Sequence, residues 1–171
     1  MLSYLIFGVT ILFLFFLLSM VWPPDSPWAP WWRTSKKTAR AICKLADVQK
    51  EDIVYDLGSG EGTALLIAAK EFGATGVGVE IDFSRVIFSK IILKINGLSN
   101  KVRIIRGNLF NQNIQKASVI FVYLVPKTLD RLLPKFKKEL KKGTRIVSYK
   151  YEMNLPLKKY DKENQIRLYI I

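Results

Sequence analysis

Two carboxylates lie near a glycine-rich turn in this sequence. Residues 53–62 read Ile-Val-Tyr-Asp-Leu-Gly-Ser-Gly-Glu-Gly, and Glu80 ends a short apolar run further along the chain. Glycine allows a positive φ and lets the backbone approach a ligand closely, and a helix starting after the turn would point its free N–H groups at that ligand. In doubly wound folds, an acid about twenty residues beyond such a turn accepts hydrogen bonds from ribose hydroxyls. The pattern therefore predicts a nucleoside-containing ligand.

The spacing of the glycines distinguishes between ligands of this kind. A dinucleotide fingerprint, G-x-G-x-x-G, would place its third glycine at position 63, where the chain has Thr63. The pattern here is G-x-G-x-G preceded by an acid, and it resembles the S-adenosylmethionine-binding turn of class I methyltransferases. The alternative is that the acids are solvated strand ends and the glycines an ordinary turn. The residues that we expect to bind the cofactor are Asp56, Gly58, Ser59, Gly60, Gly62 and Glu80.

Alternating strands and helices would position these residues. Apolar runs predict strands at 53–57, 76–80, 102–105, 119–124 and 145–151, and a C-terminal hairpin formed by 157–162 and 166–171. Helices are expected from Thr34 or Ser35 to about residue 47, from the glycine turn to about 72, from Ser84 to about 96, and at about 128–140. This order predicts a Rossmann-like α/β fold with a seven-stranded, mostly parallel sheet that has an antiparallel end.

One more turn should reach the ligand edge of this sheet. Asn108 follows the third expected strand, within Arg106-Gly107-Asn108. In a doubly wound fold, that position allows its side chain to contact the adenine. The alternative is an asparagine that only satisfies its own turn.

The N-terminus has a different composition. Residues 2–21 contain no charged side chain, and about twenty helical residues are long enough to cross a bilayer. We expect a transmembrane anchor at 1–22, a Pro/Trp-rich connector at 23–33 and the catalytic domain at 34–171. A cleaved signal peptide and a buried core helix are the alternatives. Because Arg33, Lys36, Lys37 and Arg40 follow the apolar run, the domain is expected on the cytoplasmic side of the membrane.

Composition restricts the chemistry further. The chain has 171 residues and a formal net charge of +13, which fits an anionic membrane surface, a nucleic acid or an acidic protein partner equally well. It has no histidine, so the commonest general base and most metal-site designs are missing, and we expect no metal. Its one cysteine, Cys43, is expected to be a small core residue.

From about Pro27 onward, the chain resembles a family of small class I methyltransferases. This family includes archaeal broad-specificity protein lysine methyltransferases and the mitochondrial enzyme that methylates a lysine in the c-ring protein of ATP synthase. The resemblance implies methyl transfer from S-adenosylmethionine to a protein lysine. The matching segments are Pro27-Trp28-Ala29-Pro30, 52–62, Gly76-Val77-Gly78-Val79-Glu80, Arg106-Gly107-Asn108, Tyr123-Leu124, Glu139-Leu140 and 143–148.

The resemblance also suggests where the methyl acceptor would bind. Tyr123 is expected to line the acceptor channel and Trp28 to close it from above, whereas Tyr149 and Glu152 are weaker candidates; each could equally be a core or surface residue. No general base is assigned, because methyl transfer from a sulfonium depends chiefly on alignment and on the exclusion of water. The chain departs from the family at Trp31-Trp32-Arg33 and at 149–152, both near the expected acceptor site.

Three other functions remain open. The enzyme could methylate a lipid or quinone, which a membrane tether would suit, or RNA, which the positive charge would suit. Tyr123-Leu124-Val125-Pro126 lacks the Asp/Asn-Pro-Pro-Tyr motif of many base methylases, which argues against that RNA chemistry only. A non-catalytic cofactor-binding module is the third, and the complete set of motif residues argues against it.

Overall fold

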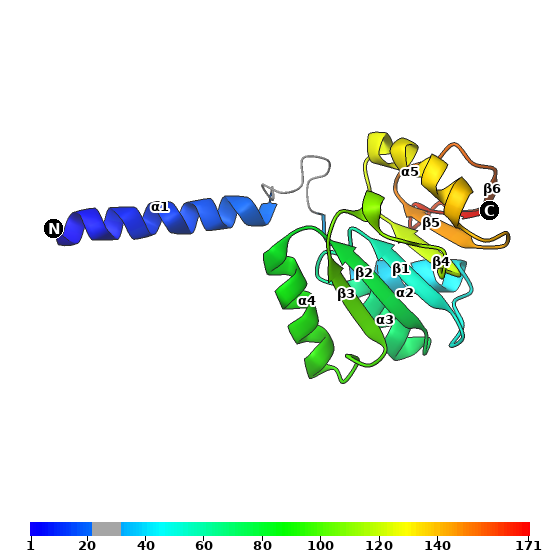
Figure 1. The fold of residues 1–171 in the computed structure, drawn as a ribbon, viewed down its shortest axis with the longest axis horizontal. Helices are drawn as coiled ribbons and strands as arrows, with labels where there is room; N and C mark the ends of the chain where they lie inside the picture. The colour runs from blue at the N-terminus through cyan, green and yellow to red at the C-terminus, as the bar shows by residue number, and fades with distance from the viewer. Residues whose placement is uncertain (22–31) are drawn as a thin grey trace.

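The computed structural model describes residues 1–21 and 32–171, and within them a seven-stranded sheet forms the centre of the domain (Figure 1). The strand order is β3-β2-β1-β4-β5-β7-β6. Strands β1 to β5 are parallel to their neighbours, whereas β7 runs antiparallel to both β5 and β6. The strands are β1 (Ile53–Leu57), β2 (Thr75–Glu80), β3 (Val102–Arg106), β4 (Val119–Val122), β5 (Arg145–Tyr149), β6 (Leu157–Asp161) and β7 (Ile166–Ile170).

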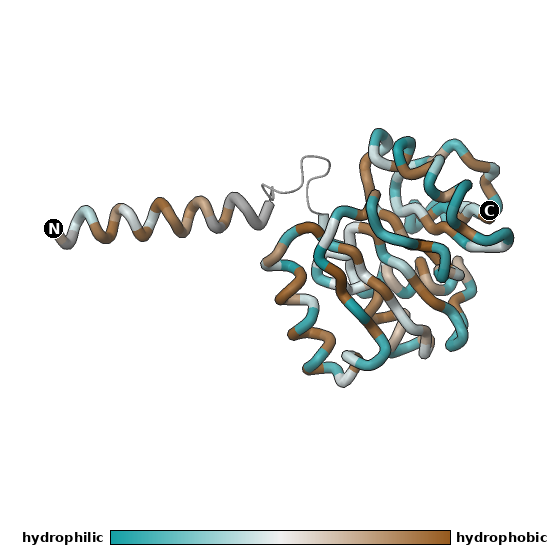
Figure 2. The backbone as a smooth tube through the Cα atoms, viewed as in Figure 1, coloured by the Kyte–Doolittle hydropathy of each residue, from teal (hydrophilic) through white to brown (hydrophobic). Residues whose placement is uncertain are grey.

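Helices cover both faces of the sheet. Their bounds are α2 (Lys36–Leu45), α3 (Thr63–Glu71), α4 (Phe83–Ile95) and α5 (Pro126–Glu139), with a short 3₁₀ helix η1 (Leu109–Asn111) after β3. Alternate strand residues point to opposite faces. On β4, for example, Val119 and Phe121 pack with α2 and α3, whereas Ile120 and Val122 pack with α5. Figure 2 shows the apolar strand segments enclosed between these layers. The Rossmann-like, mostly parallel fold predicted from the sequence is confirmed.

The helix starts show how local sequence sets the element boundaries. Ser35 caps α2, as predicted, because its side chain accepts a hydrogen bond from the Thr38 N–H. The start of α4 was predicted one residue late: Asp82, not Ser84, caps it, because Asp82 Oδ1 accepts from the Arg85 N–H at 2.9 Å. Cys43 is fully buried in the core between α2, α3 and the sheet.

The N-terminal helix α1 (Leu2–Val21) is the main departure from expectation. A bilayer span needs about 20 consecutive apolar residues, and the uninterrupted run of side chains described in α1 covers only residues 3–15. In the described part of the chain, no helix is long and apolar enough to cross a membrane. The predicted transmembrane anchor at 1–22, and the placement of the domain on the cytoplasmic side of a membrane, are therefore wrong.

Two other predictions at the N-terminus have a different outcome. Most of the connector predicted at 23–33 lies outside the described residues, as does Trp28. The domain start at residue 34 stays a prediction.

A buried ion pair holds the amino edge of the sheet together. The Asp52 carboxylate, just before β1, binds the guanidinium of Arg145 at the start of β5 and accepts hydrogen bonds from Ser118 Oγ at 2.7 Å and the Gln49 N–H at 2.7 Å. Arg145 also donates to the carbonyl oxygens of Ala46 and Asp47, both at 2.7 Å. This network connects the end of α2 to three strands.

Removing one member of such a pair leaves the other charge without compensation. We expect Asp52→Ala to lower the free energy of unfolding by about 3 kcal/mol, as measured by urea denaturation. The matched control is Glu51→Ala, because Glu51 is exposed and its carboxylate lies 3.7 Å from the Lys50 amine; it should change stability by about 0.5 kcal/mol or less. Equal effects of the two variants would contradict the role given to Asp52.

Candidate active site

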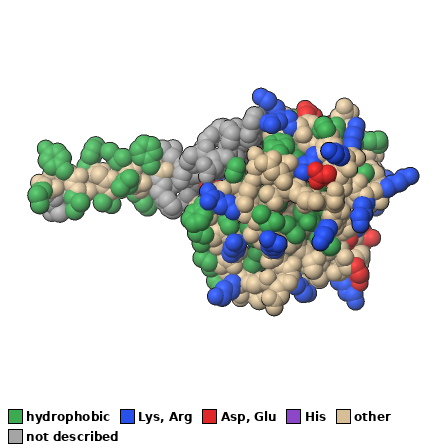
Figure 3. Space-filling model, in the orientation of Figure 1, with side chains coloured by type: hydrophobic (Ala, Val, Ile, Leu, Met, Phe, Trp, Pro, Cys, Tyr) green, Lys and Arg blue, Asp and Glu red, His purple; other side chains and the backbone are tan. Residues whose placement is uncertain are grey.

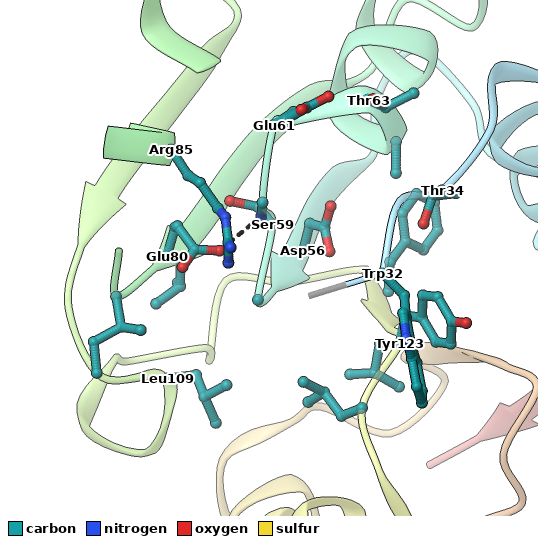
Figure 4. A pocket seen from close by; sticks show the side chains of 18 of the residues that line it. Trp32, Thr34, Asp56, Ser59, Glu61, Thr63, Glu80, Arg85, Leu109 and Tyr123 are labelled. Carbon is teal, nitrogen blue, oxygen red and sulfur yellow. Dashed lines mark hydrogen bonds between the residues drawn. The ribbon is translucent and has the colours of Figure 1, made fainter. Parts of the chain in front are cut away.

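A cavity of about 320 Å³ opens at the carboxyl edge of the parallel strands (Figure 4). Segments after β1, β2, β3 and β4 line it, together with residues 32–34. This edge is where doubly wound sheets bind their ligands, because the strand order reverses direction there. Here the reversal falls between β1 and β4. The cavity therefore lies where the sequence predicted the ligand.

The glycine turn after β1 forms one wall of the cavity. Gly58 has φ 86° and Gly60 has φ 52°, values that an L-residue rarely adopts. The Gly58 N–H donates to the Val79 carbonyl at 2.9 Å, which holds the turn against β2. Gly62, also at positive φ, begins α3 but does not line the cavity. The sequence therefore identified the turn correctly, and Gly62 has a structural place in it.

Glu80 connects the turn to the next segment. Its carboxylate is buried, 6% exposed, at the end of β2. Oε2 accepts from the Gly60 N–H at 2.8 Å, and Oε1 accepts from the Asp82 N–H at 2.9 Å. Each carboxylate oxygen has two acceptor positions, so both oxygens can still accept hydrogen bonds from a ligand.

Asp56 places a second acid in the same wall. It lies on β1, and Figure 4 shows its carboxylate directed into the cavity between the glycine turn and Trp32. Burial raises the pKa of Asp56 from 3.8 to about 7, and the neighbouring negative charge of Glu80 acts in the same direction. The site therefore contains a carboxyl group whose ionisation is sensitive to any positive charge that enters.

Ser59 and Asn108 also line the cavity, but both side chains make structural contacts. A Cβ built on Gly78 would lie 2.7 Å from Ser59 Oγ, so this hydroxyl faces β2, and it has no hydrogen-bond partner among the described residues. Asn108 caps η1, with Oδ1 accepting from the Phe110 N–H at 3.0 Å. The turn function that was the alternative for Asn108 is thus present, alongside its position on the cavity.

Four aromatic side chains gather at the opposite end of the site, and we refer to them as the aromatic cage: Trp32, Tyr123, Tyr149 and Tyr151. Ring centroids of Tyr123 lie 4.5 Å from Tyr149, 5.7 Å from Trp32 and 6.3 Å from Tyr151. The first three residues line the cavity. Tyr123 and Tyr149 were both expected near the acceptor, whereas Glu152 does not line the cavity.

Trp32 is the cavity residue that sequence reasoning missed. Its indole lies beside Tyr123 in Figure 4, and its ring stacks on Tyr151 with centroids 6.3 Å apart. The next residue, Arg33, forms an ion pair with Glu61 of the glycine turn, with Nη2 to Oε2 at 2.7 Å. Segment 32–34 therefore closes one side of the cavity. The available signal was the insertion of Trp31-Trp32-Arg33 relative to the family pattern.

Comparison with known proteins supports this assignment of the site. A Saccharolobus islandicus protein-lysine N-methyltransferase is 38% identical over 135 residues, covering 78% of this chain and 82% of that protein. A Caenorhabditis elegans lysine N-methyltransferase, described as acting on the c-ring protein of ATP synthase, is 25% identical over 115 residues, covering 67% of this chain and 60% of that protein. A solved Salinibacter ruber structure, described as an RNA methyltransferase with S-adenosyl-L-homocysteine, has a TM-score of 0.80 at 34% identity, covering 82% of this chain and 94% of that one.

The fold and the glycine turn, together with these relatives, define an S-adenosylmethionine-dependent methyltransferase. The cavity fits this cofactor because it combines close-approaching backbone at Gly58 and Gly60 with two carboxylates that suit a cationic nucleoside. More specifically, the chain belongs to the ANTKMT methyltransferase domain family, whose model matches residues 56–157.

The raised pKa of Asp56 makes a prediction about stability. Its folded-state pKa of about 7 lies above the ordinary 3.8, so the unfolded chain releases this proton first and burial of Asp56 reduces stability as pH rises from about 4 to 7. Asp56→Asn should therefore gain stability relative to the parent between pH 4 and pH 8, by up to about 4 kcal/mol. Thermal unfolding at both pH values measures this. An identical difference at both pH values would contradict it.

Proposed function

We propose that this enzyme transfers a methyl group from S-adenosylmethionine to a lysine side chain of a protein. The aromatic cage carries this proposal, because three of its rings line the cavity and could surround a lysine chain and its amine. The relatives from Saccharolobus islandicus and Caenorhabditis elegans, both described as lysine N-methyltransferases, support it.

The cofactor would be held by the glycine-turn wall of the cavity. We assign Glu80 to the ribose hydroxyls, the backbone of Gly58, Ser59 and Gly60 to close contact with the cofactor, and Asn108 to the adenine. Asp56 would attract the positive charge of the ligand. Gly62 would act by shaping the turn. The bound cofactor supplies an electrophilic methyl carbon on a sulfonium.

The acceptor would approach through the aromatic cage. A lysine amine must lose its proton before it can attack, and desolvation among apolar rings favours the neutral form. The chain has no histidine to act as a base. Its residues would therefore act by alignment and by exclusion of water, and positioning of two reactants can lower a barrier by several kcal/mol.

An RNA acceptor is the second candidate. The Salinibacter ruber relative is described as an RNA methyltransferase, and the net charge of +13 suits a polyanion. On the face shown in Figure 3, however, Lys and Arg side chains are spread over the domain and do not gather into one stripe. A lipid or quinone acceptor has no comparable support among these relatives, and a non-catalytic role does not fit the methyltransferase family.

The assignment of Glu80 can be tested by calorimetry. We expect Glu80→Ala to weaken S-adenosylmethionine binding by about tenfold to a hundredfold, because a charged hydrogen-bond acceptor is lost. Glu71→Ala is the control, since Glu71 is paired with Arg40 at 2.7 Å and does not line the cavity. Melting curves identify any loss of folding. Unchanged affinity in a folded Glu80→Ala protein would rule out the ribose assignment.

The acceptor class can be tested by incubating the full chain with methyl-labelled S-adenosylmethionine and separate protein, RNA and lipid fractions. We expect label in protein, released as methyl-lysine on acid hydrolysis. The Glu80→Ala protein should transfer little label in the same assay. Label confined to RNA would replace the lysine proposal by the second candidate, and label confined to lipid would exclude both.

A further inference from the structure

One lysine of the chain already lies against the aromatic cage. Lys150 follows β5 directly, and its Nζ lies 5.4 Å from the ring centroid of Tyr123, 5.6 Å from Tyr149 and 5.7 Å from Trp32. An ammonium group within about 6 Å of an aromatic face is attracted by the ring quadrupole. Three rings therefore share one cation, and all three line the cavity.

Other cation–ring contacts in the described part of the chain are simpler. Arg106 lies over Phe83, Arg131 over Phe110 and Arg167 over Tyr160, each pairing one guanidinium with one ring. A single pair of this kind is an ordinary surface contact. The arrangement around Lys150 differs because its rings come from three separate segments, at residues 32, 123 and 149, and because these rings border the methyl-donor cavity.

The backbone holds Lys150 in an uncommon conformation. Its φ is 65°, in the left-handed region that side chains other than glycine rarely adopt. The Lys150 N–H donates to the Gln165 carbonyl at 2.8 Å, and its carbonyl accepts from Arg167 Nη1 at 2.7 Å. Non-glycine residues persist in such conformations when the surrounding structure fixes them, and they cluster at functional sites. Here the conformation fixes the origin of the side chain beside the cage.

We infer that Lys150 is an intramolecular methyl acceptor of this enzyme, a modification site at the mouth of its own cavity. The inference rests on the proposed lysine methylation, because it requires the cage to accept a lysine amine. Its basis is that an exposed lysine side chain occupies the position that the acceptor amine of a substrate would take. An attached acceptor also has a high effective concentration, which favours reaction within one chain over reaction between chains.

The chemistry balances without any further reactant. The neutral Nζ of Lys150 forms a bond to the methyl carbon while the carbon–sulfur bond breaks. The electron pair of that bond stays on sulfur, which leaves as the thioether of S-adenosylhomocysteine, and the proton of the amine passes to water. The products are methyl-lysine at position 150 and S-adenosylhomocysteine.

Deprotonation sets the speed of this reaction. The hydrogen bond with Tyr123 raises the pKa of Lys150, and the neighbouring Tyr149 and Tyr151 act in the same direction. Arg167, from β7, contacts the Lys150 carbonyl from the other side. Since only the neutral amine attacks, self-methylation should be slow at neutral pH and should accelerate as pH rises towards the ordinary lysine range.

The test is mass spectrometry of the full chain after incubation with methyl-labelled S-adenosylmethionine and an added lysine-containing protein. We expect methyl mass on the peptide that contains Lys150, appearing at least about tenfold faster than on Lys158, an exposed lysine of β6. Lys150→Arg, which keeps the positive charge, should remove the methyl mass from that peptide. The first-order rate constant should not change with protein concentration.

A mixing experiment separates reaction within a chain from reaction between chains. Tagged Glu80→Ala protein is incubated with untagged parent, and we expect Lys150 to stay unmodified in the tagged chain. Equal methylation of both chains would overturn the intramolecular assignment. Label on the added protein but not on Lys150 would overturn the inference and leave the proposed function intact, whereas no label on either protein would remove the proposed function and this inference with it.

Discussion

The position of one buried carboxylate organises the ligand edge of this enzyme. Glu80 accepts hydrogen bonds from the Gly60 N–H, in the turn after β1, and from the Asp82 N–H, at the start of α4. Parallel pairing of β1 and β2, with Leu57 opposite Val79, brings these segments to the same edge. A Cβ on Gly78 would come within 3.0 Å of Ile104, Ser59 and Leu65, so close packing here depends on a missing side chain. Sheet register, glycine and carboxylate therefore act together.

This arrangement has an electrostatic cost before the cofactor binds. Asp56 and Glu80 are both buried, at 8% and 6% exposed, on adjacent strands, and Asp56 responds with a raised pKa. Two neighbouring acids disfavour each other's ionisation, whereas a positively charged ligand between them relieves the repulsion. Strongly perturbed acids are common at functional sites for this reason. The same pair thus disfavours the empty protein and favours a cationic cofactor.

The sequence predicted the cofactor half of the site well because its signals are local. Strand, glycine turn and helix follow one another between residues 53 and 71, and β1 was predicted with its observed bounds. The end of β4 was less accurate: the apolar run continues to Leu124, but the ladder stops at Val122, before Pro126 opens α5. Hydrophobicity identifies such a strand, whereas its end depends on the segment that follows.

The aromatic cage could be predicted only in part because its members are distant in sequence. Tyr123 was expected near the acceptor because it directly follows a central strand, and Tyr149 because it ends β5. Trp32 belongs to a segment without any periodic pattern, and only the folded chain brings it within 5.7 Å of Tyr123. The positive φ of Lys150 also has no local signal, since lysine is not a residue type typical of that conformation.

The two halves of the cavity differ in what they are made of, and this has a functional consequence. The cofactor wall consists of backbone and two acids fixed by sheet register, so few substitutions are compatible with it. The cage consists of side chains from three separate segments, and a change in any of them alters the acceptor end without disturbing the glycine turn. Relatives described as acting on protein lysine and on RNA can therefore share this fold. Acceptor choice is a property of the cage, and the fold alone does not determine it.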